Sequence, residues 1–182
     1  MVLAMPSDAL WGDGSGYLTH ADCDAERWTV EEVVEATAAA APTLAAGARL
    51  SIAGLSMGGY GALRLGAKFP HLFESISAHS AIAWFREMAG FVEEPLESYA
   101  GNVPLEELDP LFWIKRNRAR LPRLRFDCGL SDTLLEGNRR LHGSLEFEGI
   151  PHRYEEFDGG HEWSYWESNV ARTLRFANEA AS

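Results

Sequence analysis

The sequence predicts an α/β fold, with a mostly parallel sheet of about five strands and helices on both faces. Short strand-like runs alternate with helical patterns along the chain, and this order requires parallel strands joined by right-handed crossovers. The length of 182 residues suits a single domain, 1–182, with one substantial core. Functional residues are then expected at the carboxyl ends of the strands.

Five short runs have the length and pattern of strands: 2–5, 49–53, 74–78, 124–128 and 152–157. Helical patterns lie between and after them, at 29–41, 57–68, 132–147 and 163–177. Thr29 and Glu32 form a capping box that is predicted to open the first of these helices. Residues 82–120 fit neither period and are predicted to form a cap-like excursion over the top of the sheet, where such folds build a lid or an acyl pocket.

The net charge of −11 disfavours nucleic-acid and anionic-membrane partners. No apolar run approaches the roughly 20 residues that span a bilayer. Cys23 and Cys128 lack CxxC spacing, and the start MVLAMPSDAL does not have the pattern of a secretory leader. A cytoplasmic protein that acts on a small molecule is therefore expected.

Residues 53–60 read AGLSMGGY, which contains the GxSxG pattern of a nucleophile elbow centred on Ser56. A predicted strand precedes Ser56, a predicted helix follows it, and the neighbouring glycines leave room for a sharp turn. The pattern predicts a nucleophilic Ser56, with the Met57 amide as an oxyanion donor at the helix N-terminus. The alternative is a small polar residue in a glycine-rich turn, because GxSxG also arises by chance.

A serine hydroxyl needs a base, and His161 fits best among the six histidines because it follows the last predicted strand in a loop. His79 ends a strand and is the nearest rival. The orienting acid is predicted to be Asp132, in the loop after 124–128, where it would hold the imidazole in its productive tautomer. Asp127 lies inside that strand and is expected to be a satisfied sheet residue, whereas Asp158 is too close to the histidine to orient it well.

No metal is predicted, because HEWSY lacks the second histidine four residues after His161 that a zincin would have. No other His, Cys or carboxylate cluster has ligand spacing. The remaining histidines are expected to be structural or exposed: His20, His71, His142 and His152.

Three segments together carry a family resemblance: IAGLSMGGYGAL, CGLSDTLLEGN and DGGHEWSYWE, with 132 − 56 = 76 and 161 − 132 = 29 residues between the candidate side chains. They resemble the esterase D-like branch of the α/β-hydrolases, in particular the tributyrin esterases, over nearly the whole chain. The resemblance implies a serine carboxylic-ester hydrolase that acts on short-chain acyl esters through an acyl-enzyme. Ser56 would be the nucleophile, Asp132 the acid and His161 the base, without a cofactor. An S-formylglutathione-type thioesterase is the second implication.

The resemblance also implies an N-terminally shortened α/β-hydrolase-like sheet. Relatives carry sequence ahead of their counterpart of VLAMPSDALWGDG, including an HG-type turn that gives the second oxyanion amide. A strand between 2–5 and 49–53 would then be missing. Three explanations stay open: segment 2–5 pairs directly with 49–53, a second chain covers the edge in a homo-oligomer, or the reading frame is shortened. A catalytically impaired hydrolase-like scaffold is the alternative function.

Three aromatic residues are candidates for an apolar acyl pocket, although each also suits an ordinary core: Trp84, Phe85 and Trp163.

Overall fold

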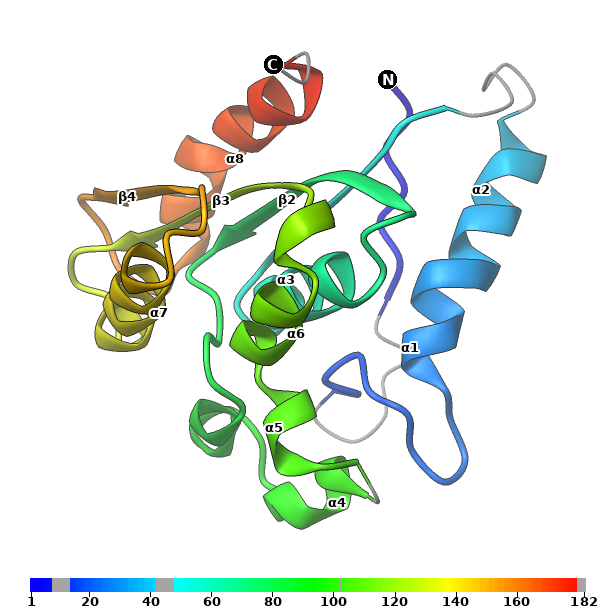
Figure 1. Cartoon of the computed structure of the whole chain (residues 1–182), viewed down its shortest axis with the longest axis horizontal. Coiled ribbons are helices and arrows are strands. Elements are labelled where there is room, and N and C mark those ends of the chain that lie inside the picture. Colours follow the sequence, from blue (N-terminus) through cyan, green and yellow to red (C-terminus); the bar gives the residue numbers. More distant parts are fainter. Residues whose placement is uncertain (8–13, 42–47, 102, 180–182) are drawn as a thin grey trace.

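The structure, a computed structural model, describes residues 1–7, 14–41, 48–101 and 103–179. Its sheet has four strands in the order β1-β2-β3-β4, and each neighbouring pair is parallel (Figure 1). The strands are β1 (Leu50–Leu55), β2 (Phe73–His79), β3 (Arg123–Gly129) and β4 (Arg153–Phe157). The predicted α/β class is confirmed, and these four strands lie within two residues of their predicted bounds.

The fifth predicted strand, 2–5, does not form. These residues are exposed chain without regular structure, and their side chains line a groove together with Trp28, Val33 and Ala36 of the first helical segment. The apolar side chains that suggested a strand therefore lie against a helix. Direct pairing of 2–5 with β1 is not adopted, since β1 pairs only with β2 in the described sheet.

That first helical segment is continuous from Ala25 to Ala40. It comprises α1 (Ala25–Arg27), a π-helical turn (Trp28–Glu32) and α2 (Val33–Ala40). The predicted capping box at Thr29 is wrong, because Asp24 caps the segment by accepting the Arg27 N–H at 3.0 Å. Thr29 lies one turn inside the helix and its hydroxyl donates to the Ala25 carbonyl. An Asx cap ahead of the predicted start thus gave the helix an extra turn.

Helices cover both faces of the sheet (Figure 1). One face packs against α3 (Met57–Lys68), α6 (Pro110–Arg116) and α7 (Leu135–Phe147), and the other packs against α8 (Trp163–Asn178). Successive side chains of a strand point to opposite faces of the sheet, so one face can be apolar and the other polar. Apolar residues such as Ile76 and Phe126 join the main core beneath α3, α6 and α7. Their neighbours in sequence are polar and are buried on the side of α8: Ser75, Ser77, His79, Arg125 and Asp127.

Between β2 and β3 the chain forms a series of short helices. They are a 3-10 helix (Phe85–Gly90), α4 (Leu96–Ala100), α5 (Leu105–Leu108), α6 and a second 3-10 helix (Arg118–Arg120). This region packs on α3 through a second core cluster, in which the Tyr60 hydroxyl donates to the Leu108 carbonyl at 2.7 Å. The cap-like role of 82–120 stays a prediction.

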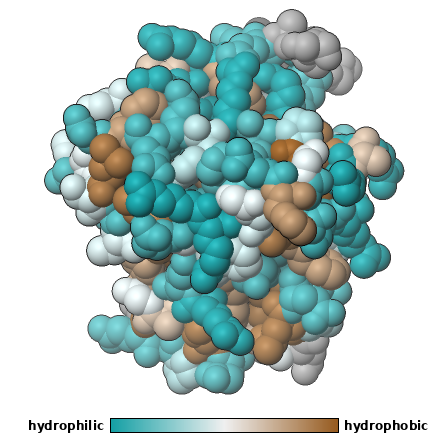
Figure 2. All heavy atoms as spheres, turned by 60° about the vertical axis from the view of Figure 1, so that its left-hand side comes forward, coloured by the Kyte–Doolittle hydropathy of each residue, from teal (hydrophilic) through white to brown (hydrophobic). Residues whose placement is uncertain are grey.

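On the face seen in Figure 2, hydrophilic side chains predominate and the hydrophobic ones form small separate groups. Within the described ranges, no helix has both the length and the apolar character needed to cross a membrane.

Close packing of α3 on the sheet makes one glycine critical. A Cβ at Gly66 would lie 2.5 Å from Ile76 and 2.9 Å from Ile52, so we expect Gly66→Ala to lower the free energy of unfolding by about 1–3 kcal/mol. Gly143→Ala is the matched control, because its Cβ would meet no atom within 4 Å and should stabilise α7 by about 0.4–1 kcal/mol. Urea denaturation measures both. Equal effects of the two substitutions would contradict the packing described.

We propose self-association through the end of the sheet formed by β1, since the unpaired backbone groups of an edge strand can receive another strand. Size-exclusion chromatography with light scattering at micromolar concentration is expected to show a dimer. A monomer throughout that range would contradict the proposal.

Candidate active site

The turn between β1 and α3 holds Ser56 in a rare backbone conformation. Its φ of 52° and ψ of −119° lie where L residues are strained. The turn is so tight that a Cβ at Gly54 would stand 2.1 Å from the Gly58 carbonyl oxygen. The glycine spacing in GxSxG thus has a steric cause, and Ser56 directly precedes the first residue of α3.

Three backbone hydrogen bonds hold Ser56 in this turn. Its N–H donates to the His79 carbonyl at 3.0 Å, and its carbonyl accepts the N–H groups of Tyr60 (3.1 Å) and Ile82 (3.2 Å). Two of these partners belong to the end of β2 and the residues just after it. The position of the serine therefore depends on the neighbouring strand as well as on its own helix.

Asp132 and His161 lie in the loops that follow β3 and β4. The two loops bind each other, because the Leu130 N–H donates to the Phe157 carbonyl (2.8 Å) and the Ser131 N–H donates to the Gly159 carbonyl (2.9 Å). This pairing extends the β3–β4 contact beyond the sheet and brings the carboxyl and the imidazole together.

The three predicted side chains form one hydrogen-bonded line. The Ser56 hydroxyl lies 2.9 Å from His161 Nε2, and His161 Nδ1 lies 3.1 Å from both Asp132 carboxylate oxygens. The Asp132 side chain is fully buried, whereas 21% of the His161 side chain is exposed. The arrangement leaves the serine and the imidazole accessible and the acid enclosed.

The environment of Asp132 favours the carboxylate. Burial raises the pKa of this carboxyl, but hydrogen bonds from His161 and from the Leu134 N–H outweigh burial, so the pKa lies below its usual value. A carboxylate accepts a hydrogen bond from Nδ1–H, which leaves Nε2 as the acceptor that faces the Ser56 hydroxyl.

Two aromatic rings that the sequence interpretation missed pack on His161. The ring centroid of Phe91 lies 5.3 Å from that of the imidazole, and that of Trp166 lies 5.1 Å away with the rings perpendicular. Trp166 could have been found from its position in the first turns of the helix that follows His161. Phe91 had no sequence signal, since it comes from the aperiodic region 82–120.

The predicted pocket aromatics occupy three different environments. The Trp84 indole N–H donates to the Gly137 carbonyl at 3.0 Å and its ring lies under Arg140, so this side chain is bound to α7. Phe85 is buried in the second core cluster, against which Met57 and Phe91 also pack. Trp163 is 69% exposed at the start of α8 and stacks edge-on with Trp166. Their roles in substrate binding stay predictions.

His79, the rival base, lies on the α8 side of the sheet and is buried with Asp127. The interpretation of Asp127 as a satisfied sheet residue is confirmed, because His79, Arg125 and Tyr165 all donate to its carboxylate. Across the described parts of the chain, no group of three or more His, Cys, Asp or Glu could hold a metal ion.

Comparison with protein families agrees with this geometry. The model of the Esterase family, described as "Putative esterase", matches residues 23–177. The chain belongs to this esterase family. An acetyl esterase of Caldicellulosiruptor saccharolyticus is 30% identical in an alignment 165 residues long, which covers 82% of this chain and 62% of that relative. The chain thus spans less than two thirds of the relative's length.

Solved structures show the same fold. An S-formylglutathione hydrolase from Agrobacterium tumefaciens is 25% identical with a TM-score of 0.72, over 90% of this chain and 62% of that one. FphF, a fluorophosphonate-binding serine hydrolase of Staphylococcus aureus, is 23% identical with a TM-score of 0.76, over 91% of this chain and 68% of that one. The esterase D-like α/β-hydrolase fold implied by the sequence is confirmed.

The lowered pKa of Asp132 makes the stability of the esterase-family chain depend on pH. The folded state gains stability from the carboxylate above the unfolded pKa of about 3.9, and this gain is lost as pH falls through the folded value. We expect the free energy of unfolding, measured with urea, to fall less steeply with acidification in Asp132→Asn than in the wild type. Identical slopes would contradict the predicted contribution of Asp132.

Proposed function

We propose that this chain hydrolyses short-chain acyl esters through an acyl-enzyme intermediate on Ser56. The observation that carries the proposal is the continuous line from the Ser56 hydroxyl through both ring nitrogens of His161 to Asp132, at 2.9 and 3.1 Å. Membership of the esterase family and the similarity to an acetyl esterase support this reaction class and a small acyl group.

In the proposed reaction, Ser56 Oγ attacks the ester carbonyl while His161 Nε2 takes the hydroxyl proton. The imidazolium then gives that proton to the leaving alkoxide, and the acyl group stays on Ser56. Asp132 holds Nδ1–H throughout and stabilises the positive charge. A water molecule activated by His161 next attacks the acyl-enzyme, which releases the acid and restores the serine.

The negative charge that develops on the carbonyl oxygen needs a donor fixed beforehand. The Met57 N–H is proposed for this role, because it begins α3 and has no carbonyl four residues earlier within that helix to accept its proton. The dipole of α3, a helix of 12 residues, favours negative charge at the same end.

A thioester substrate is the second candidate. The specific observation in its favour is the similarity to an S-formylglutathione hydrolase structure. Thioester and ester hydrolysis share the same attack on an acyl carbonyl and differ in the leaving group, so the site described serves either.

A cytoplasmic location is proposed from the cysteines. Cys23 and Cys128 are free thiols, and Cys128 is buried in β3, which suits a reducing compartment.

The proposal is tested with p-nitrophenyl acetate and butyrate. The wild-type chain is expected to release p-nitrophenol, and Ser56→Ala should lower kcat by at least about 10³-fold, because no hydroxyl remains to form the acyl-enzyme. Thermal unfolding of Ser56→Ala controls for folding. A fluorophosphonate probe should label the wild type and fail to label the variant. Equal hydrolysis by both proteins, or none by the wild type, would identify a scaffold without this chemistry.

A further inference from the structure

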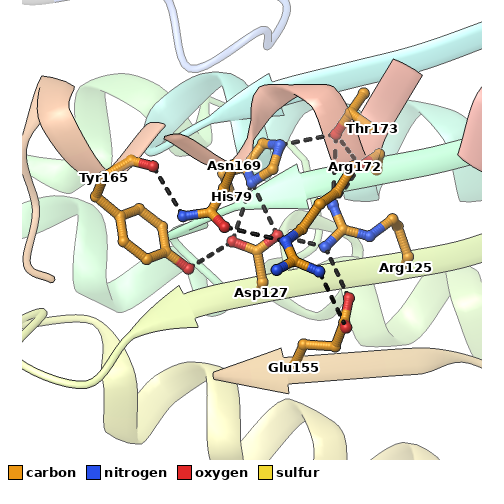
Figure 3. Close-up of polar contacts among 9 residues, drawn as sticks. His79, Arg125, Asp127, Glu155, Tyr165, Asn169, Arg172 and Thr173 are labelled. Carbon is orange, nitrogen blue, oxygen red and sulfur yellow. Dashed lines mark hydrogen bonds and ion pairs between the residues drawn. The ribbon is translucent and has the colours of Figure 1, made fainter. Parts of the chain in front are cut away.

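A buried polar cluster lies between the sheet and α8, on the opposite face from the main core (Figure 3). Its centre is His79, the last residue of β2, which is only 5% exposed. The imidazole is bonded on both sides: Nδ1 lies 2.8 Å from Asp127 on β3, and Nε2 lies 2.7 Å from the Thr173 hydroxyl on α8. The ring therefore joins two strands and a helix.

The partners of His79 are themselves fixed. Asp127 also accepts the Tyr165 hydroxyl at 2.6 Å and the Arg125 guanidinium, and Arg125 reaches Glu155 on β4 at 3.2 Å. Thr173 Oγ1 lies 2.6 Å from the Ser77 hydroxyl. A buried carboxylate and guanidinium with satisfied hydrogen bonds form a directional network, which holds its members in place more strictly than apolar packing does.

The backbone of the same residue reaches the active site. The His79 carbonyl accepts the Ser56 N–H at 3.0 Å, and the next residue, Ser80, has a left-handed φ of 46° while its N–H donates to the Asp127 carbonyl at 2.7 Å. Ile82 then returns to bind the Ser56 carbonyl. Two of the three backbone bonds that hold the strained serine thus come from a segment whose first residue is anchored by its imidazole.

We propose that His79 is a positioning residue for the nucleophile: its imidazole, anchored to Asp127 and Thr173, fixes the carbonyl that holds the Ser56 amide. The inference rests on the proposed function, because positioning is read out through the reactivity of Ser56. His79 contacts no reacting atom. Its effect is transmitted by the backbone, where a displacement of about 1 Å can lower a rate about a hundredfold.

The test compares substitutions of His79 with a control substitution in the same strand, β2. His79→Leu removes both side-chain bonds and is expected to lower kcat by about 10- to 100-fold while KM changes by less than about twofold. The rate of fluorophosphonate labelling of Ser56 should fall in parallel. His79→Asn keeps an amide donor near the position of Nδ1, so it should bond Asp127 and return kcat to within about threefold of the wild type.

Ser75→Ala is the matched control. It removes a buried hydroxyl from the same strand, but the partner of that hydroxyl is Ser51 and neither His79 nor its partners, so it should lower the unfolding midpoint without changing kcat. Assays are run well below the unfolding temperature of each variant. If His79→Leu does not fold, Thr173→Val is used instead. It removes the Nε2 partner of His79 and the Thr173 contacts with Ser77 and Arg125, leaves the bond between His79 and Asp127, and should lower kcat by about 3- to 10-fold.

A loss of stability in His79→Leu with unchanged kcat and labelling rate would overturn the inference and leave the proposed function intact, provided that the wild type shows Ser56-dependent hydrolysis. If His79→Leu does not fold, an unchanged kcat in Thr173→Val would overturn it in the same way. A wild type that neither hydrolyses esters nor reacts with the probe would overturn the proposed function, and this inference with it.

Discussion

The strained backbone of Ser56 is the constraint on which the site depends. A serine with φ near 52° costs about 1–3 kcal/mol, so the conformation persists only where surrounding contacts enforce it. Gly54 allows the close approach of the Gly58 carbonyl. His79 at the end of β2 and Ile82 just after it bind the N–H and the carbonyl of the serine. The strain places the hydroxyl at the carboxyl edge of the sheet, where His161 Nε2 meets it.

A second constraint keeps the Asp132 carboxyl and the His161 imidazole together. A Cβ at Gly129 would lie 2.4 Å from the Gly159 carbonyl oxygen, so the loops carrying Asp132 and His161 touch backbone to backbone. Their contact follows from strand order, because β3 and β4 are adjacent and parallel and both loops leave the same edge. The serine comes from β1, at the far side of the sheet, and the imidazole bridges that separation.

Sequence patterns predicted correctly the elements whose bounds are set by residues nearby in the chain. The bounds of α3 agree with the sequence because the sharp turn at Ser56 precedes it and Pro70 follows it. Segment 2–5 was predicted wrongly because a short apolar run suits a strand or a helix-packing segment equally, and only tertiary contacts decide. Phe91 reaches His161 through the packing of an aperiodic region, which no local pattern encodes.

The face of the sheet under α8 is polar, so hydrogen bonds as well as apolar contacts hold this helix in place. Packing between apolar surfaces tolerates small shifts, whereas hydrogen bonds from Tyr165 and Thr173 to partners on the strands fix the helix along and around its axis. His161 lies two residues before the first residue of this helix. The same helix therefore sets the position of the His161 imidazole from its N-terminus and, in the proposed arrangement, supports the backbone that holds Ser56 through Thr173 and His79. Docking of α8 thus acts on both sides of the hydrogen bond between the Ser56 hydroxyl and His161.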